Sequence, residues 1–411
     1  MRDDSWQVSS SNPNEMAPML TPLDPLPEPL RANEEGTFTQ DSVVRRLPEI
    51  ARRIAAENGL DPDQAGAVET LAVEIGDGYV TPLDEPEAED AAAWVAHVEP
   101  YAGMTWIDAP WFFIETYFYR RMLAATGYSQ PGPRQGVDPF LRQKQIALDG
   151  AVGLAARLGG ALDDTRTLIA AALWANRVDL SLWPADGGDA DSRIEAVLGS
   201  QGVSRLLVDD TDAVLEVLNG PEVNVHIVLD NAGAELIADL ALVTNILRNG
   251  GRVTIHAKPH PTFVSDVTLP DLDATIQRLA AEPNPAHQIA RAISTATGDG
   301  ALQVTTHPFW VSPGAGWLCP PDLVENLSEA DLIIFKGDAN YRRLLGDLHW
   351  DPTTPIDRII RPPQPLLALR TAKAEVVAGL TPEVVRRAAG TDPAWISSGE
   401  WGLVQYVEPE A

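Results

Sequence analysis

The stretch that decides the fold is VNVHIVLDNAGAE, residues 223–235. Its apolar, β-branched run from Val223 to Leu229 is typical of a buried strand. Asp230 and Asn231 follow at once, and an amphipathic pattern over 233–248 then predicts a helix. A strand, a short polar loop and a helix in this order make up the first part of a βαβ unit.

The same alternation continues on both sides of this unit. Apolar runs predict further strands at Arg205–Val208, Arg252–Ala257, Gln303–Thr306, Asp331–Phe335 and Pro365–Leu369. Amphipathic patterns predict helices near 211–219, 271–281, 285–297 and 339–346. The chain is therefore expected to form an α/β fold, a Rossmann-like α/β/α sandwich with a mostly parallel sheet.

Upstream of this region the patterns are helical. They predict helices at Val43–Asn58, Ala91–Val98, Phe112–Thr126 and Phe140–Leu158. The first 40 residues are rich in Ser, Asn, Pro and Glu and show little periodicity. We expect a loose arm over 1–40, a helical domain over 41–170 and an α/β domain over 171–411.

Composition limits the partners and the compartment. The formal net charge of −29 over 411 residues argues against nucleic acid and anionic membranes, because Lys and Arg drive both kinds of binding. No run is long and apolar enough to span a membrane and no secretory signal is seen, so a cytoplasmic location is expected. Cys319 is the single cysteine, so oxygen or imidazole must hold any metal. The oligomeric state stays open.

Polar residues follow two neighbouring strands, where parallel sheets bind ligands. Asp230 and Asn231 follow the first, and Ser265-Asp266-Val267-Thr268 lies beyond the second. Two carboxylates and an amide oxygen are hard donors that suit Mg²⁺ or Mn²⁺. Taken singly, each residue is more often a helix cap. Their convergence on one edge predicts a metal site made of Asp230, Asn231 and Asp266.

Cations follow the last two predicted strands. Asp331–Phe335 leads into Lys336-Gly337-Asp338-Ala339-Asn340-Tyr341-Arg342, and Pro365–Leu369 leads into Arg370-Thr371-Ala372-Lys373. A lysine before a glycine and a helix start favours phosphate binding, since the ammonium and the free backbone N–H groups both attract anions. Such cations would reverse the local sign for an anionic substrate. Scattered, solvated surface cations are the alternative.

Two further contacts come from upstream. Glu115 shares a helical face with Trp111 and Tyr119, a stripe that is more often core but that can bring Glu115 to the site. Asn176 lies at the expected domain junction. His256 and His260 lack the His-Glu-x-x-His helix of a zinc site, and the sequence contains no dinucleotide fingerprint, Walker A loop or Gly-x-Ser-x-Gly elbow.

In this order, the motifs resemble those of the metal-dependent damage-control phosphatases, formerly a domain of unknown function. Asp-Asn-Ala-Gly-x-Glu stands at 230–235, Ser-Asp-Val-Thr at 265–268 and Lys-Gly-Asp-x-Asn-Tyr-Arg at 336–342. Arg-Thr-x-Lys at 370–373 is similar to the branch that includes acidic residue methyltransferase-like proteins. The resemblance runs from about Trp106 to Lys373.

The resemblance implies a helical domain on a Rossmann-like core. It also implies hydrolysis of sugar phosphates or related metabolites with Mn²⁺, Co²⁺, Ni²⁺ or Mg²⁺. By position, its metal ligands are Asp230, Asn231 and Asp266, and its substrate contacts are Glu235, Asp338, Asn340, Arg342 and Lys373. This sequence departs from the family in Ala175, where relatives commonly have Gly in Trp-Gly-Asn, and in Val267. Neither change removes a ligand.

We expect Asp230 and Asp266 to be the catalytic carboxylates, with Lys336, Arg370 and Lys373 stabilising charge on a phosphoryl group. Metal-polarised water and an aspartyl-phosphate route both stay open. One rival function is an S-adenosylmethionine-dependent protein carboxyl methyltransferase, although its Gly-rich loop is missing after the first strand. The other is a non-catalytic metabolite-binding protein, against which the intact ligand set argues.

Overall fold

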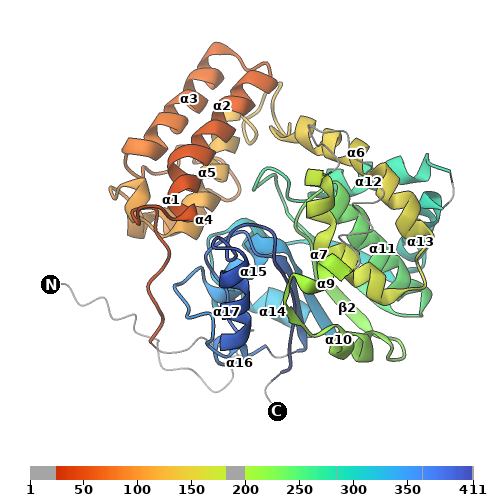
Figure 1. The fold of residues 1–411 in the computed structure, drawn as a ribbon. Coiled ribbons are helices and arrows are strands. Elements are labelled where there is room, and N and C mark those ends of the chain that lie inside the picture. Colours follow the sequence, from red (N-terminus) through yellow and green to blue (C-terminus); the bar gives the residue numbers. More distant parts are fainter. Residues whose placement is uncertain (1–24, 182–199, 284, 363, 410–411) are drawn as a thin grey trace.

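The computed structural model describes residues 25–181, 200–283, 285–362 and 364–409, without the side chains of 176–181 and 200–201. A unit of helices from the first part of the chain stands beside an α/β body (Figure 1). Residues 1–24 of the expected arm lie outside these ranges. The next segment is held by two isolated β-bridges, one between Pro29 and Leu348 and one between Arg31 and Pro110.

A seven-stranded sheet forms the centre of the body, in the order β1-β7-β6-β5-β2-β3-β4. Its strands are β1 Leu206–Asp209, β2 Asn224–Val228, β3 Arg252–Ala257, β4 Leu302–Thr306, β5 Leu332–Lys336, β6 Leu366–Thr371 and β7 Gly402–Val407. The five strands from β6 to β4 are parallel, whereas β7 is antiparallel to β6 and parallel to β1. The predicted α/β class with a mostly parallel sheet is confirmed; β7 was not anticipated.

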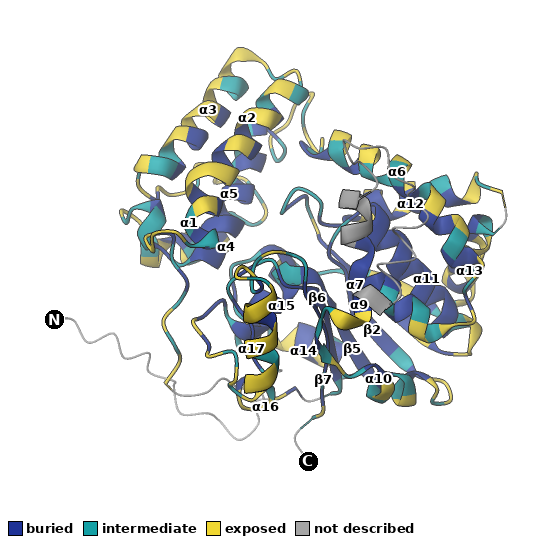
Figure 2. Ribbon diagram, viewed as in Figure 1, coloured by how far each residue is buried: buried dark blue, intermediate teal, exposed yellow. Residues whose placement is uncertain are grey.

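Alternate residues of the central strands enter two different cores. On β5, Ile333 and Phe335 join one core, while Leu332 and Ile334 join the other. Strands buried on both faces read as continuous apolar runs, which is why the sequence shows no polar alternation there. Figure 2 shows these strands as buried. The parallel arrangement brings the carboxyl ends of β2, β3, β5 and β6 to one edge of the sheet.

One face of the sheet is covered by helices that surround α11. They are α6 Leu141–Gly159, α7 Thr165–Ser181, α10 Thr211–Leu218, α11 Ala234–Arg248, α12 Leu269–Ala280 and α13 Ala286–Asp299. Both α6 and α7 pack on α11. The expected domain boundary at residues 170/171 falls within α7, and it stays an expectation.

The other face carries helices from the second half of the chain, and its core continues into the N-terminal helices. The former are α14 Pro321–Leu327, α15 Gly337–Leu345, α16 Ile356–Ile359 and α17 Pro382–Thr391. The short α9 Ser200–Ser204 directly precedes β1. Much of α17 is exposed (Figure 2). Short 3₁₀ turns lie at Pro308–Val311 and Gly316–Leu318. Leu344 of α15 and Phe335 of the sheet share one core with the N-terminal helices.

The N-terminal unit is helical, as predicted. It contains α1 Phe38–Asp41, a π-helical turn Ser42–Arg46, α2 Leu47–Glu57, α3 Pro62–Asp77, α4 Ala91–Val98 and α5 Trp111–Thr126, with 3₁₀ turns at Glu99–Tyr101 and Trp106–Asp108. Helix α3 was not predicted, because Gly66 and Gly76 interrupt its apolar pattern. A capping box between Asp61 and Gln64, with proline at the first helical position, starts it.

Two buried histidines make stability depend on pH. His226 Nδ1 on β2 lies 3.1 Å from His256 Nε2 on β3. Burial lowers the pKa of His226 to about 4. Burial, and then the neighbouring His226 and His307, lower the pKa of His256 to about 3. Both rings stay neutral in the fold, while the unfolded chain takes up protons near its ordinary pKa of about 6.5. Folded stability is therefore lost as pH falls below about 6.5.

We predict that His226→Phe reduces this loss. Between pH 7 and pH 5 the unfolding free energy of the wild type should fall by on the order of 1–2 kcal/mol for each of the two histidines. In the variant the fall should be smaller by the contribution of one histidine. Urea unfolding followed by tryptophan fluorescence at both pH values measures it. His287→Phe on α13 is the control and should keep the wild-type pH dependence. Equal pH dependence in all three proteins would contradict the assignment.

Candidate active site

Two loops at the carboxyl edge of the sheet pair with each other. The first follows β2 and carries Asp230 and Asn231; the second follows β3 and carries Ser265 and Asp266. Asn231 and Asp266 form an antiparallel bridge, and Ala232 N donates to Ser265 O at 2.7 Å. Val267 N donates to Asp230 O at 2.8 Å. This short ladder fixes the two loops that carry the predicted metal ligands.

The side chain of Asn231 links the polar groups of this edge. Its Nδ2 donates to Asp230 Oδ2 at 2.6 Å and to Glu235 Oε2 at 2.9 Å. Its Oδ1 accepts from Ser265 Oγ at 2.6 Å. Asn231 therefore holds two carboxylates on one side and the Asp266 loop on the other.

The carboxylates of Asp230 and Asp266 are buried close to each other. Burial, followed by the charges of Asp266 and Glu235, raises the pKa of Asp230 well above its ordinary value. Burial raises the pKa of Asp266 to about 6, although Lys258 opposes the rise. Desolvated carboxylates that repel each other favour the uptake of a proton or of a cation.

The donor set at this edge fits a hard divalent cation. Asp230 Oδ1 is buried and accepts no hydrogen bond from the described residues, so one ligand atom is free. Across the described part of the chain, no three His, Cys, Asp or Glu side chains gather as a metal group. The predicted set contains two carboxylates and an amide oxygen, which leaves coordination positions for water and substrate.

Gly337 allows α15 to approach these carboxylates. Its φ is +81°, and a Cβ atom placed there would lie 1.8 Å from Asp230 Oδ2. Only glycine fits, on both conformational and steric grounds. The sequence Lys336-Gly337-Asp338 therefore brings the backbone at the start of α15 directly against Asp230.

Two lysines are buried: Lys336, the last residue of β5, and Lys258, which directly follows β3. Lys336 Nζ donates to Ala172 O at 2.6 Å and to Glu235 Oε1 at 3.0 Å, and lies 3.0 Å from Asp239 Oδ1. The ammonium thus makes two hydrogen bonds and one further ion pair within the protein. Lys258 Nζ donates to Asn340 Oδ1 at 3.2 Å and lies 3.3 Å from Asp266 Oδ2.

Lys258 and Ser265 were missed in the sequence. The signal for Lys258 was present, because it follows the apolar run of β3 as Lys336 follows that of β5. Ser265 directly precedes Asp266, but its bond to Asn231 depends on the pairing of the two loops. That pairing cannot be read from either loop alone.

Lys373 differs from the two buried lysines. Its residue is half-buried, and its backbone N donates to Asp338 Oδ1 at 3.2 Å. Burial raises the pKa of Asp230, and the Lys373 charge is one of those that oppose the rise. Its charge therefore acts on the carboxylate of Asp230, while the residue remains partly accessible.

Arg370 and Asp338 support the loop that carries Lys373. Arg370 is fully buried, and its Nε donates to Asp338 Oδ1 at 2.9 Å. Its Nη2 donates to Ala374 O at 2.9 Å and its Nη1 to Val376 O. The guanidinium thus stabilises the backbone that directly follows Lys373.

Three other predicted substrate contacts are engaged within the protein. Arg342 binds Asp347 through Nε and Nη2 at 2.8 and 3.0 Å, and its Nη1 donates to Glu115 Oε2 at 2.5 Å. Asn340 Nδ2 donates to Lys336 O at 2.8 Å and to Leu229 O at 3.1 Å. Glu115 and Arg342 thus join α5 to α15. Asn176 lies in α7, with its side chain outside the described residues.

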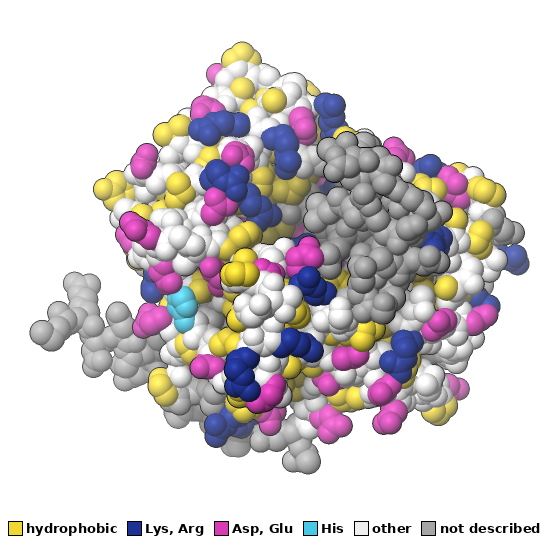
Figure 3. All heavy atoms as spheres, in the orientation of Figure 1, with side chains coloured by type: hydrophobic (Ala, Val, Ile, Leu, Met, Phe, Trp, Pro, Cys, Tyr) yellow, Lys and Arg dark blue, Asp and Glu magenta, His cyan; other side chains and the backbone are white. Residues whose placement is uncertain are grey.

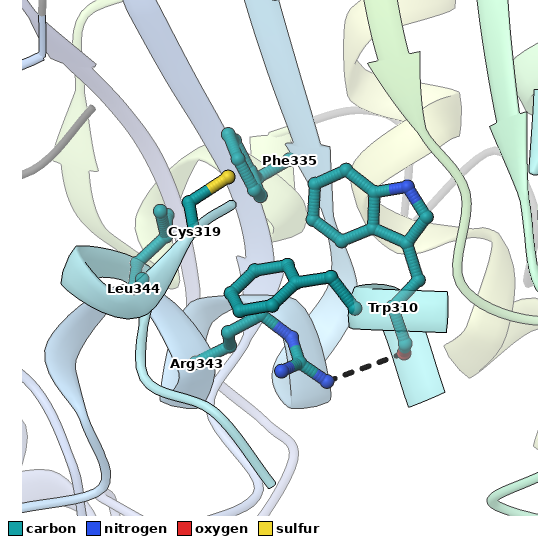
Figure 4. A pocket seen from close by; sticks show the side chains of 7 residues that line it. Trp310, Cys319, Phe335, Arg343 and Leu344 are labelled. Atoms are coloured by element: carbon teal, nitrogen blue, oxygen red, sulfur yellow. Dashed lines mark hydrogen bonds between the residues drawn. The ribbon is translucent and has the colours of Figure 1, made fainter. Parts of the chain in front are cut away.

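The neighbourhood of Asp230 therefore combines Asn231, Glu235, Asp266, Asp338 and Lys373. On the face drawn in Figure 3, acidic and basic side chains are interspersed and no single basic patch dominates. A small cavity lies elsewhere, between Cys319, Phe335 and Arg343, where Arg343 donates to Trp310 O (Figure 4). Its volume of about 10 Å³ holds at most one water molecule.

Known proteins resemble this chain over most of its length. A family model described as the damage-control phosphatase ARMT1-like domain matches residues 42–387. Relatives named damage-control phosphatase ARMT1 align with 93% of this chain: those of Danio rerio (30% identity, 97% of its length), Xenopus laevis (31%, 99%) and Homo sapiens (30%, 99%). A crystal structure of a DUF89 family protein from Pyrococcus horikoshii matches with a TM-score of 0.48 and 18% identity, over 84% of this chain and 93% of that one.

We predict that Gly337→Ala disrupts this edge. The new methyl group meets Asp230, so the free energy of unfolding should fall by on the order of 2–4 kcal/mol in urea titrations. Gly250→Ala is the matched control, because Gly250 also has a positive φ, +86°, but a Cβ atom there meets nothing within 4 Å. Its loss should stay near 1–2 kcal/mol, about the cost of the left-handed conformation alone. Equal losses in the two variants would refute the close contact.

Proposed function

Since this chain belongs to the damage-control phosphatase ARMT1-like domain family, we propose that it is a divalent-metal-dependent phosphatase that hydrolyses a sugar phosphate or a related phosphorylated metabolite. The observation that carries this proposal is the pair of buried carboxylates, Asp230 and Asp266, with a free oxygen on Asp230. Family membership agrees with the resemblance seen in the motifs. In the part of the chain that the structure describes, no helix combines the length and apolarity needed to cross a bilayer.

Asp230, Asn231 and Asp266 would hold the metal, for which Mn²⁺, Co²⁺, Ni²⁺ and Mg²⁺ are the candidates. When bound, a divalent cation supplies Lewis acidity toward a phosphoryl oxygen and lowers the pKa of a bound water. Asp230 Oδ2 is already held by Asn231, which leaves Oδ1 as its free donor. Lys258 keeps Asp266 oriented from the protein side.

Lys373 is the cation that we assign to the phosphoryl group. It is half-buried and close to Asp230, so its ammonium can meet an anion without leaving the protein. Asp338 and Arg370 hold the loop that carries it. Lys336 is buried deeper than Lys373, and its ammonium compensates the charges of Glu235 and Asp239. We assign Glu235 and Asp338, the other carboxylates of this edge, to substrate hydroxyl groups.

The first test is phosphate release from a panel of sugar phosphates and p-nitrophenyl phosphate. After chelation the rate should fall to background, and restoring Mg²⁺, Mn²⁺, Co²⁺ or Ni²⁺ singly should recover it. Asp266→Asn should lower the rate at least about 100-fold, because a carboxylate ligand is lost. Asp209→Asn, at the end of the reversed strand β1, is the control and should keep the rate. No release with any metal would contradict the proposal, and S-adenosylmethionine-dependent methyl transfer would be assayed next.

Substitution of Lys373 and substitution of Lys336 should have different effects on KM and on the unfolding free energy. Lys373→Met should raise the KM for a sugar phosphate about tenfold or more, with little change in unfolding free energy, because it removes a substrate contact. Lys336→Met should instead lower the unfolding free energy by on the order of 3–5 kcal/mol, since it leaves buried carboxylates uncompensated. Steady-state kinetics and urea unfolding of both variants measure the difference. A large stability loss in Lys373→Met with an unchanged KM would refute its role.

A further inference from the structure

The turn that precedes Asp266 is strained. Phe263 and Val264 have φ values of +45° and +69°, in the left-handed region that non-glycine residues rarely adopt. Val264 is β-branched, which makes it a marked outlier. Ser265 N donates to Phe263 O at 2.8 Å, so the chain reverses within three residues, a type of turn that is rare at positive φ. Such strain persists only where the surrounding structure imposes it.

The ring of Phe263 is held by the N-terminal unit. It packs on Tyr119 with ring centroids 5.1 Å apart and on Phe112 with centroids 6.2 Å apart. Both partners lie on α5 and are buried. Helix α5 is itself joined to α15 by the ion pair between Glu115 and Arg342. The contact thus connects a helix from the start of the chain with the loop after β3.

The strained turn determines where two site residues lie. Ser265, directly after it, donates to Asn231 Oδ1 at 2.6 Å and accepts from Ala232 N at 2.7 Å. Asp266 comes next, and its N donates to Thr262 O at 3.3 Å across the turn. Relaxation of φ at Phe263 or Val264 would rotate the following peptides and move both residues away from Asp230.

We propose that Phe263 is a positioning residue. Its ring packs against Phe112 and Tyr119 and thereby holds the strained turn. The turn in turn places Ser265 and Asp266 next to Asp230 and Asn231. The metal-binding part of this statement rests on the proposed function. Through the Phe263 side chain, the N-terminal helices thereby affect the loop that carries Asp266. Phe263 is half-buried and packs at the margin of the core that contains Tyr119.

The test compares Phe263→Ala, Val264→Gly and the double variant by hydrogen exchange of the metal-free protein. In Phe263→Ala, peptides that cover 262–268 should exchange at least tenfold faster, because the strained turn has lost its anchor. Val264→Gly should exchange like the wild type, because glycine adopts this conformation without strain. The double variant should exchange more slowly than Phe263→Ala, since less strain remains to be released.

Phe113→Ala is the matched control on the same helix. The Phe113 ring packs on Tyr101 and Tyr117, on contacts separate from the turn. It should change exchange in α5 but not selectively in 262–268. If Phe263→Ala did not fold, Phe263→Leu, which loses the ring contacts and keeps apolar bulk, would replace it.

Mn²⁺ titration by calorimetry provides the second readout. Phe263→Ala should weaken the Kd at least tenfold, and Val264→Gly in the same chain should restore part of the loss. Unchanged exchange and unchanged Kd in Phe263→Ala, or no rescue by Val264→Gly, would overturn the inference. If the wild type bound none of Mn²⁺, Co²⁺, Ni²⁺ and Mg²⁺, the proposed function would fail, while the exchange data would still decide whether Phe263 holds the turn.

Discussion

The rest of the structure depends on two carboxylates that are buried where they repel each other. Asp230 and Asp266 meet because parallel strands end at one edge and because their loops pair through backbone hydrogen bonds. Removing them from water is costly, and their pKa values rise accordingly. Much of the surrounding polar structure responds to that cost. Lys258 lies against Asp266, and Asn231 donates to Asp230. The lack of a side chain at Gly337 leaves space for the Asp230 carboxylate.

The N-terminal helices also contribute to this arrangement. The Glu375 carboxylate, two residues after Lys373, accepts from Phe38 N at 2.8 Å and from Thr39 N at 3.2 Å at the start of α1. On the other side, Arg342 of α15 pairs with Glu115 of α5 and lies 3.6 Å from the centre of the Trp111 ring. The N-terminal unit thus contacts the Lys373 loop and α15, the two elements that bound Asp230. A displacement of the unit would be felt at the site.

The sequence predicts which strand ends carry polar residues, but not which charges pair. The positions of Asp230, Asp266 and Lys373 follow from apolar runs that end in polar motifs, and convergence follows from the parallel topology. The orientation of Lys336 does not, because it depends on Glu235 and Asp239 on α11, roughly 100 residues earlier in the chain. Arg342 likewise turns to a partner more than 200 residues distant. Pairing of this kind is set by packing, for which local periodicity holds no signal.

The reversed strand β7 shows the same limit for the fold. Its run Gly402–Val407 is apolar enough for a strand, but its antiparallel pairing with β6 depends on the loop that Arg370 holds. That pairing starts at Thr371 opposite Gly402, which lies against the Trp174 ring. A side chain at 402 would collide with the indole. A single glycine therefore permits the strand to close beside the Lys373 loop.

The charges at the edge bear on how the proposed phosphatase would receive an anion. The carboxylates in question are Asp230, Glu235, Asp239, Asp266 and Asp338, and the cations are Lys258, Lys336, Arg370 and Lys373. With every group ionised, they leave one net negative charge, which opposes a phosphate. One divalent cation would leave one net positive charge. In the proposed enzyme the buried cations would therefore not need to touch the substrate. Lys258, Lys336 and Arg370 offset part of the charge of Asp266, Glu235, Asp239 and Asp338, so that a single metal ion would reverse the sign of the site.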